Sequence, residues 1–181
     1  MSERMAMSRV WAMPNADTFS VEPIHNFVWK YLHQAKVSID PFARNRRWAT
    51  YTNDINPKTE AEFHLDATEF LDMLREREVK ADFLIFDPPY SARQLKEVYN
   101  GFGREMQLED GQLGRIKKEW RNHALPLLTN DAVILSFGWN SVGFGSGLGF
   151  ELEEIMLVSH GGEHNDTICI AERRIQGGLF A

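Results

Sequence analysis

Apolar residues along the chain form short runs with the composition of β-strands, and segments with helical spacing separate several of them. Strands are predicted at 37–40, 48–54, 62–67, 83–86, 132–137, 151–158 and 167–172. Strands that alternate with helices or loops are typical of an α/β fold with a mostly parallel sheet and helices on both faces. We expect the last two of these seven strands to pair in antiparallel fashion, and the first dozen residues to be a frayed terminus.

Four segments have apolar residues at the three- and four-residue spacing of an amphipathic helix. The first helix is predicted from about Pro23 to Ala35, and the second follows Asp66. The third follows Ser91, which can cap it, and the fourth carries the apolar residues between Leu113 and Ala124. Each of these helices can cover part of a sheet with its apolar face.

Four of the predicted strands end at an acidic residue, and the four acids are Asp40, Asp54, Asp66 and Asp87. The carboxyl ends of parallel strands meet at one edge of the sheet, which is where ligands bind in such folds. We therefore expect a ligand site lined by acids. Each acid also has an ordinary structural interpretation, because Asx turns and helix caps use the same residues.

The run Phe83-Leu84-Ile85-Phe86 ends in Asp87-Pro88-Pro89-Tyr90. Neither proline has an N–H, and a residue before proline is restricted to extended backbone, so this stretch presents hydrogen-bond acceptors. The Asp87 carboxylate and the Pro88 carbonyl can each accept one N–H of an exocyclic amino group, which frees the nitrogen lone pair for attack. Tyr90 can stack on a base turned out of its helix. The alternative is a turn that merely ends the strand.

Composition restricts the class of protein. The 181 residues, 43% of them hydrophobic, suit one globular domain. The single cysteine, Cys169, excludes an internal disulfide and favours a reducing compartment. No segment has the length and apolarity of a signal or a membrane span, so we expect a cytoplasmic protein without membrane contact. A formal net charge of −6 limits nucleic-acid contacts to local basic clusters.

The sequences Asp40-Pro41-Phe42 and Asp87-Pro88-Pro89-Tyr90, in this order, resemble the motifs of S-adenosylmethionine-dependent amino methyltransferases that act on adenine N6 of DNA. The stretch from Phe137 to Ser141 is similar to that of small phage and prophage members. This resemblance implies a Rossmann-like methyltransferase fold of seven strands in one domain, without a separate target-recognition domain. It also implies S-adenosylmethionine as cofactor, a flipped adenine as acceptor, and Asp87, Pro88, Pro89 and Tyr90 as catalytic residues.

The candidate cofactor-binding residues come from the first three predicted strand ends. An acid at the end of the second strand suits ribose hydroxyls, and Asp54 takes that role, with Ile55 packing on the adenine ring. Asp66 would accept from the adenine amino group, or else cap the following helix together with Glu69. In the resembling family a glycine-rich turn follows Asp-Pro-Phe, but this chain has Ala43, Arg44 and Asn45 there. The full expected set is Asp40, Phe42, Ala43, Asp54, Ile55, Asp66 and Ala67.

The candidate substrate residues are aromatic or basic. Trp139 and Asn140 are expected near the base, in a glycine-containing loop predicted to be a flexible flap. Basic residues in the loop after the first strand and on the fourth helix could meet phosphate, although both could equally be solvated. The full expected set is Tyr90, Trp139, Asn140, Arg44, Arg46, Lys117 and Arg121. His160, His164 and Asp166 match no familiar metal spacing, so no metal is expected.

Several alternatives stay open at this point. Related motifs serve cytosine N4, RNA adenine and protein amides, and the acidic balance is compatible with each of these acceptors. The glycine-poor turn is also compatible with a silent binding module that kept the fold. We expect a short or relaxed target sequence, or specificity supplied by a partner or a second copy of the chain. The sequence does not distinguish host-restriction evasion, restriction–modification and regulation.

Overall fold

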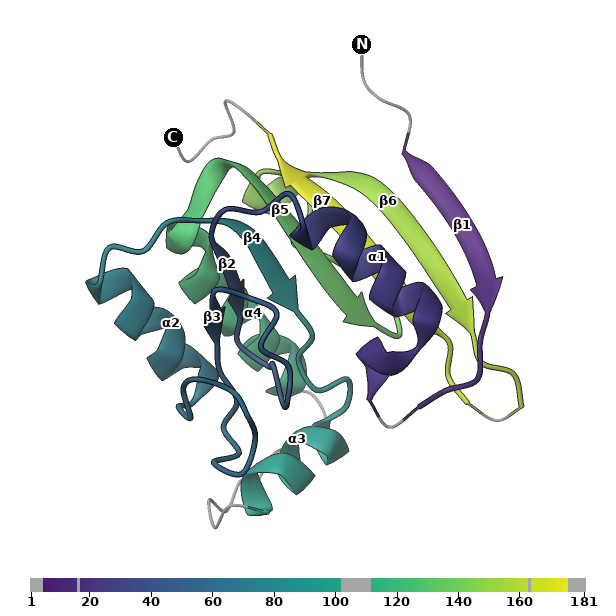
Figure 1. Ribbon diagram of the computed structural model, residues 1–181, viewed down its shortest axis with the longest axis horizontal. Coiled ribbons are helices and arrows are strands. Elements are labelled where there is room, and N and C mark those ends of the chain that lie inside the picture. The colour runs from purple at the N-terminus through teal and green to yellow at the C-terminus, as the bar shows by residue number, and fades with distance from the viewer. Residues whose placement is uncertain (1–4, 16, 102–111, 163, 176–181) are drawn as a thin grey trace.

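A seven-stranded sheet forms the centre of the computed structural model, which describes residues 5–15, 17–101, 112–162 and 164–175 (Figure 1). The strand order is β1-β6-β7-β5-β4-β2-β3. β7 is antiparallel to both of its neighbours, and the other pairs are parallel, as expected. The strands are β1 (Ala6–Trp11), β2 (Ser38–Asp40), β3 (Tyr51–Thr52), β4 (Ala81–Phe86), β5 (Leu128–Gly138), β6 (Phe150–Ser159) and β7 (Thr167–Arg174).

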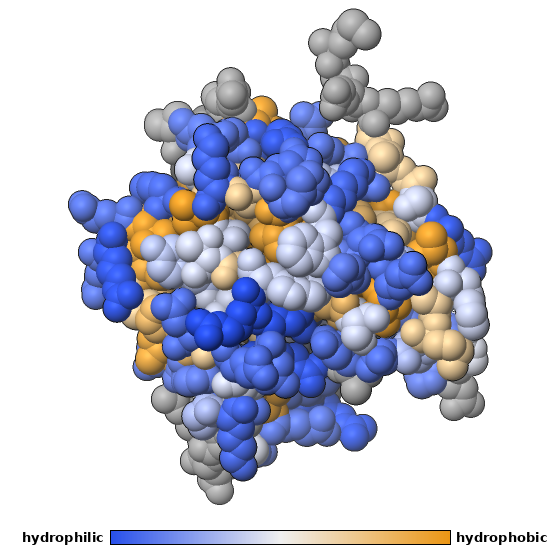
Figure 2. Space-filling model, in the orientation of Figure 1, coloured by the Kyte–Doolittle hydropathy of each residue, from blue (hydrophilic) through white to orange (hydrophobic). Residues whose placement is uncertain are grey.

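Helices cover both faces of the sheet (Figure 1). α1 (Glu22–Leu32) covers one face, and its predicted apolar stripe is buried there. α2 (Ala67–Glu76) and α4 (Gln112–Ala124) pack on the other face, and α3 (Ala92–Asn100) follows β4. Short 3-10 turns lie at η1 (Thr18–Ser20), η2 (Leu125–Leu127) and η3 (Ser146–Leu148). Figure 2 shows hydrophilic residues over most of the face that carries α1, with separate apolar patches among them.

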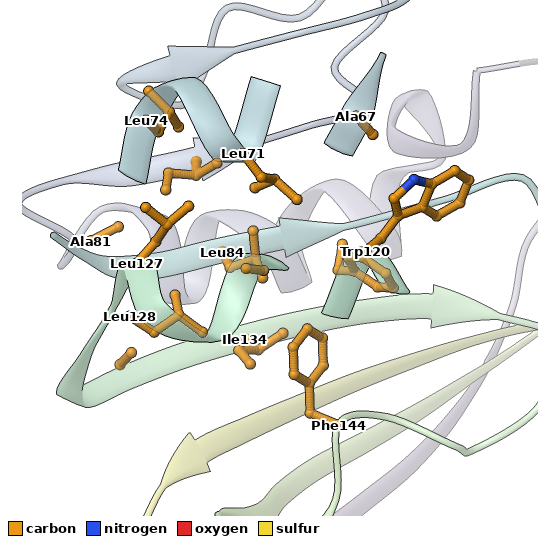
Figure 3. Packing of buried hydrophobic residues seen from close by; sticks show 14 of the residues in the cluster. Ala67, Leu71, Leu74, Ala81, Leu84, Trp120, Leu127, Leu128, Ile134 and Phe144 are labelled. Atoms are coloured by element: carbon orange, nitrogen blue, oxygen red, sulfur yellow. The ribbon is translucent and has the colours of Figure 1, made fainter. Parts of the chain in front are cut away.

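β4 joins the two sides of the core. Phe83 and Ile85 point to the α1 side, whereas Leu84 and Phe86 point to the side of α2 and α4. A strand buried on both faces has a continuous apolar run rather than an alternating one, which is the pattern of this segment. Figure 3 shows Leu84 packed between Leu71 of α2 and Ile134 of β5.

The first strand of the structure was not expected. β1 pairs in parallel with β6, with Met7 opposite Ile155, where a frayed terminus was predicted. Met7 is 72% exposed and Trp11 is 65% exposed, so the segment lacks the buried positions from which a strand is predicted. Backbone pairing holds this edge strand in place.

The predicted strand at 62–67 is wrong. Only one bridge forms there, between Asn53 and Phe63. The Asn53 side chain donates to the Leu65 carbonyl at 3.0 Å and accepts from the Leu65 N–H at 2.9 Å. An amide side chain therefore replaces the backbone ladder, and β1 at the opposite edge supplies the seventh strand.

Several hydrogen bonds hold the glycine-containing loop between β5 and β6, which the sequence predicts to be a flexible flap. The buried Glu172 carboxylate accepts from the Phe144 and Gly145 N–H groups, both at 2.7 Å. Arg121 donates to the Gly143 carbonyl at 2.8 Å. A Cβ on Gly143 would lie 2.0 Å from the Glu172 carboxylate, so a larger residue would displace this buried group from its hydrogen bonds to the loop.

Candidate functional site

The carboxyl end of β4 carries the Asp87–Tyr90 loop into the site. β4 lies between β2 and β5, and all three run in parallel, so their carboxyl ends meet at one edge of the sheet. Asp87 follows the last residue of β4 directly. Ser91 then caps α3 by accepting from the Gln94 N–H at 3.2 Å. The loop is thus fixed between a buried strand and a capped helix.

A cavity of about 490 Å³ opens beside this loop. We call it the acidic cavity, because Asp54 and Asp87 both line it. It also has contributions from α3 and from the segment before α1. Among its lining residues are several that the sequence singles out: Phe42, Arg44, Asp54, Ile55, Ala67, Asp87, Pro88, Pro89 and Tyr90.

Asp54 is both a turn residue and a cavity residue. Its Oδ1 accepts from the Asn56 N–H at 2.8 Å, which forms an Asx turn, and its Oδ2 accepts from the Arg44 N–H at 3.1 Å. Each carboxylate oxygen has a second lone pair, so the group can still accept from a ligand hydroxyl. The two interpretations of this acid are therefore compatible.

Asp66 caps α2. It accepts from the Thr68 N–H at 2.9 Å, and the Glu69 carboxylate accepts from the Asp66 N–H at 3.2 Å, so the predicted capping box is confirmed. The Tyr99 hydroxyl donates to the other Asp66 oxygen. An adenine amino group would have to share or displace these partners, although the adjacent Ala67 does line the acidic cavity.

Asp40 and Ala43 lie beneath the cavity rather than on its lining. Asp40 is 1% exposed and accepts from the Phe42 N–H at 3.0 Å. Burial raises the pKa of Asp40 to about 7, although the nearby Arg46 guanidinium lowers it. Ala43 is fully buried, and its N–H donates to the Asn53 carbonyl. Arg44 has φ +54°, so the turn keeps a left-handed residue without a glycine.

Tyr90 contacts Asp87 directly. Its hydroxyl donates to Asp87 Oδ1 at 2.7 Å, and its ring lies edge-on to Trp139 with 5.7 Å between centroids. Burial raises the pKa of Asp87, whereas this hydrogen bond and the Arg46 and Arg44 guanidinium groups lower it. An amine that binds Asp87 can take Oδ2, or the second lone pair of the Oδ1 that accepts from the tyrosine hydroxyl.

A second cavity, of about 320 Å³, lies on the other side of Pro88 and Tyr90. We call it the cationic cavity, because Lys117 and Arg121 of α4 line it. The structure brings four of the expected substrate residues together here with Tyr90: Lys117, Arg121, Trp139 and Asn140. Pro88 and Tyr90 line both cavities, so the two cavities adjoin at the Asp87–Tyr90 loop.

No protein-family model and no curated protein matches the sequence. Several solved structures match the fold. NSun6 from Pyrococcus horikoshii, solved with SFG, has 15% identity and a TM-score of 0.53 over 81% of this chain and 50% of its own. TrmN from Thermus thermophilus has 14% identity and a TM-score of 0.52 over 86% and 49%. A SAM-dependent methyltransferase from Agrobacterium tumefaciens has 15% identity and a TM-score of 0.51 over 84% and 61%.

The chain has the Rossmann-like methyltransferase fold. It spans about half the length of NSun6 and TrmN. Within this methyltransferase fold, β2 is joined to β3 by residues 41–50 without a helix, and β5 is joined to β6 with only η3 between them. Both connections are loops at the edge where the two cavities lie.

Arg46 corrects one expectation for the substrate residues. It is 7% exposed, it donates to Asp17 at 2.8 Å, and its guanidinium lies 3.9 Å from the centre of the Phe19 ring. A side chain held in this way is not available to a nucleic-acid phosphate. Its positive charge instead favours the ionised forms of Asp40 and Asp87.

Three residues of the site region were missed by sequence reasoning. Thr18 lines the acidic cavity, Tyr99 binds the helix cap at Asp66, and Asn53 holds the Leu65 segment. Thr18 lies in the short η1 turn before α1, and no local sequence pattern singles it out. The roles of Tyr99 and Asn53 depend on pairs far apart in sequence, which no local pattern indicates.

Within the described ranges, no group of three or more His, Cys, Asp or Glu side chains could hold a metal ion. None of the helices that the structure describes is both long enough and apolar enough to cross a bilayer.

Proposed function

We propose that the protein transfers the methyl group of S-adenosylmethionine to the N6 amino group of adenine in DNA. One observation carries this proposal: Asp87 and Pro88, with the acceptor chemistry that an exocyclic amine requires, line the same cavity as Asp54 and Ile55. The methyltransferase fold of the chain supports the cofactor class. Adenine N6 as the acceptor rests on the resemblance of the Asp-Pro-Pro-Tyr sequence.

The residues of the acidic cavity fit this cofactor. Asp54 can accept from ribose hydroxyls, Ile55 and Ala67 offer apolar contacts, and Asp87 supplies negative charge toward a cationic ligand. Asp40 is buried directly before the lining residues Pro41 and Phe42, and it adds a third carboxylate to Asp54 and Asp87. When bound, S-adenosylmethionine supplies an electrophilic methyl group.

The Asp87 carboxylate and the Pro88 carbonyl would accept the two N–H bonds of the adenine amino group. Acceptors held in place before reaction contribute roughly 2.7–4 kcal/mol each to transition-state stabilisation. The amine nitrogen would bond to the methyl carbon as the bond from that carbon to the sulfonium sulfur breaks, with S-adenosylhomocysteine as the leaving group. The nitrogen would then release one proton to solvent, so no covalent enzyme intermediate is needed. Cys169 is buried in the core against α1, which argues against a cysteine nucleophile.

Calorimetric titration with S-adenosylmethionine tests the cofactor half of the proposal. The Asp54→Ala variant loses hydrogen bonds to a charged group, so its affinity should fall by about ten- to a hundredfold. Glu62→Ala removes an exposed acid of the same region and should leave the affinity unchanged. Absence of binding by the wild-type protein would favour a silent module, and equal binding by Asp54→Ala would exclude the ribose contact.

A second candidate keeps the reaction and changes the acceptor to RNA adenine, cytosine N4 or a protein amide. The formal net charge of −6 is compatible with an acceptor other than DNA. In either case we propose a short or relaxed target sequence, or specificity supplied by a partner or a second copy of the chain. Reaction with mixed DNA followed by sequencing of the methylated positions tests this, and a long strict site made by the lone chain would contradict it.

A further inference from the structure

The cationic cavity has donors that nothing in the described structure satisfies. Ser136 is 5% exposed and lines the cavity, and its hydroxyl has no hydrogen-bond partner among the described residues. The same is true of the buried Arg121 Nε. Buried polar atoms without partners are uncommon and cost free energy. Both atoms belong to residues that line this cavity, so a ligand with hydrogen-bond acceptors would give them partners once the side chains turn toward it.

Lys117 adds a positive charge to these donors. It lies one helical turn before Arg121 on α4, and both side chains line the cavity. Like charges at this spacing repel each other. Burial lowers the pKa of Lys117, and the neighbouring Arg121 guanidinium lowers it further. Burial also lowers the pKa of Arg121. The Asp87 carboxylate raises the pKa of Lys117 and the Glu172 carboxylate raises that of Arg121, but burial is the larger effect on each. An anion between these cations would relieve both effects.

Only part of the basic face of α4 contributes to this arrangement. Arg115 and Lys118 are exposed on the same helix and do not line the cavity, whereas Lys117 and Arg121 are partly buried. The four basic side chains of α4 between Arg115 and Arg121 are therefore divided into two pairs. Two cations face solvent, and two face a walled cavity next to the Asp87–Tyr90 loop.

We propose that the cationic cavity binds a single phosphate group, held by Lys117, Arg121 and Ser136. Lysine and arginine are common ligands of phosphate groups, and a serine hydroxyl can donate a further hydrogen bond to a phosphate oxygen. If the proposed function is correct, this phosphate is one attached to the acceptor nucleoside. Because Pro88 and Tyr90 line both cavities, a nucleotide can reach from this phosphate to Asp87. The substrate is then a single strand or an unpaired nucleotide, since a phosphate in a walled cavity has left the regular duplex.

Titration with inorganic phosphate, followed by calorimetry at constant ionic strength in chloride, tests the site without any methyl transfer. The wild-type protein should bind one phosphate per chain. Lys117→Gln and Ser136→Ala should each weaken this binding, the lysine variant by about ten- to a hundredfold. Lys118→Gln removes an exposed charge of the same helix and should change the affinity less than about twofold.

No saturable binding by the wild-type protein would overturn the site. Equal weakening by Lys117→Gln and Lys118→Gln would also overturn it, because it would indicate a general charge effect. Circular dichroism of each variant identifies loss of fold. If Lys117→Gln does not fold, phosphate binding by Ser136→Ala tests the site.

Competition then identifies the source of the phosphate. Deoxyadenosine 5′-monophosphate and a single-stranded trinucleotide should displace inorganic phosphate, whereas deoxyadenosine should not. Displacement by duplex DNA alone would overturn the single-strand assignment. Phosphate binding without methylation of any nucleic acid would reject the proposed function and support the phosphate site. Methylation of nucleic acid without phosphate binding would support the proposed function and reject the phosphate site.

Discussion

Replacement of the buried Asp40 by Asn should stabilise the protein at neutral pH while weakening its site. Burial raises the pKa of Asp40 from 3.8 to about 7, and each pKa unit corresponds to about 1.4 kcal/mol. Ionised Asp40 therefore costs the native state about 4 kcal/mol. The asparagine Oδ1 can still accept from the Phe42 N–H, so Asp40→Asn should remove this cost without breaking the turn.

The raised pKa of Asp40 predicts that the wild-type protein becomes less stable as pH rises. Below the unfolded pKa the carboxyl is protonated in both states and contributes nothing. Between about pH 4 and pH 7 the unfolded state loses its proton while the native state keeps it, so the stability of the wild-type protein falls as pH rises. Asp40→Asn should remove this fall. Its stability advantage should be near zero at pH 4 and approach 4 kcal/mol above pH 7.

Urea unfolding of the wild-type protein and of Asp40→Asn between pH 4 and pH 8 measures this difference. The same stability difference at every pH, or a variant less stable than wild type at pH 8, would refute the argument from burial. Titration with S-adenosylmethionine supplies the functional half. A cationic ligand favours ionised Asp40, so the variant should bind it more weakly although it is more stable.

Two further predictions concern the surroundings of the site. Arg46→Met removes a charge that lowers the pKa of Asp87, so the acidic limb of the pH–rate profile for methyl transfer should move to higher pH. Arg47→Met, which removes an exposed charge, is the control. An acidic limb that does not move in Arg46→Met would contradict the role of the buried guanidinium. Gly143→Ala places a Cβ 2.0 Å from the Glu172 carboxylate and should lower the free energy of unfolding, measured with heat or urea, by about 1–3 kcal/mol. Gly147 has no atom near the position of a Cβ, so Gly147→Ala should lower it less. Equal losses in the two variants would refute the packing argument.

The sheet centre and its ligand edge were predictable because local patterns determine them. β4 is an apolar run between two buried faces, and Asp66 with Glu69 forms a helix cap within four residues of chain. These features need no long-range information. The antiparallel pair at the end of the chain likewise follows from two adjacent strand-like runs.

The parts that were not predictable depend on pairs far apart in sequence. β1 gains its place by backbone pairing with β6, about 150 residues later, and its side chains carry little signal of burial. Glu172 holds the glycine-containing loop from β7. Arg46 is buried because Asp17 and Phe19 meet it from the segment before α1. From local sequence alone, the β1 segment is expected to be exposed, the glycine-containing loop to be flexible, and Arg46 to be a basic surface residue.

The most direct test of the central claim is mass spectrometry of nucleosides from DNA and RNA after reaction with S-adenosylmethionine. The wild-type protein should produce N6-methyladenine in DNA, and Asp87→Asn should produce none while it still binds the cofactor. Undiminished methylation by Asp87→Asn would contradict the account, as would a wild-type protein that binds S-adenosylmethionine and methylates no adenine.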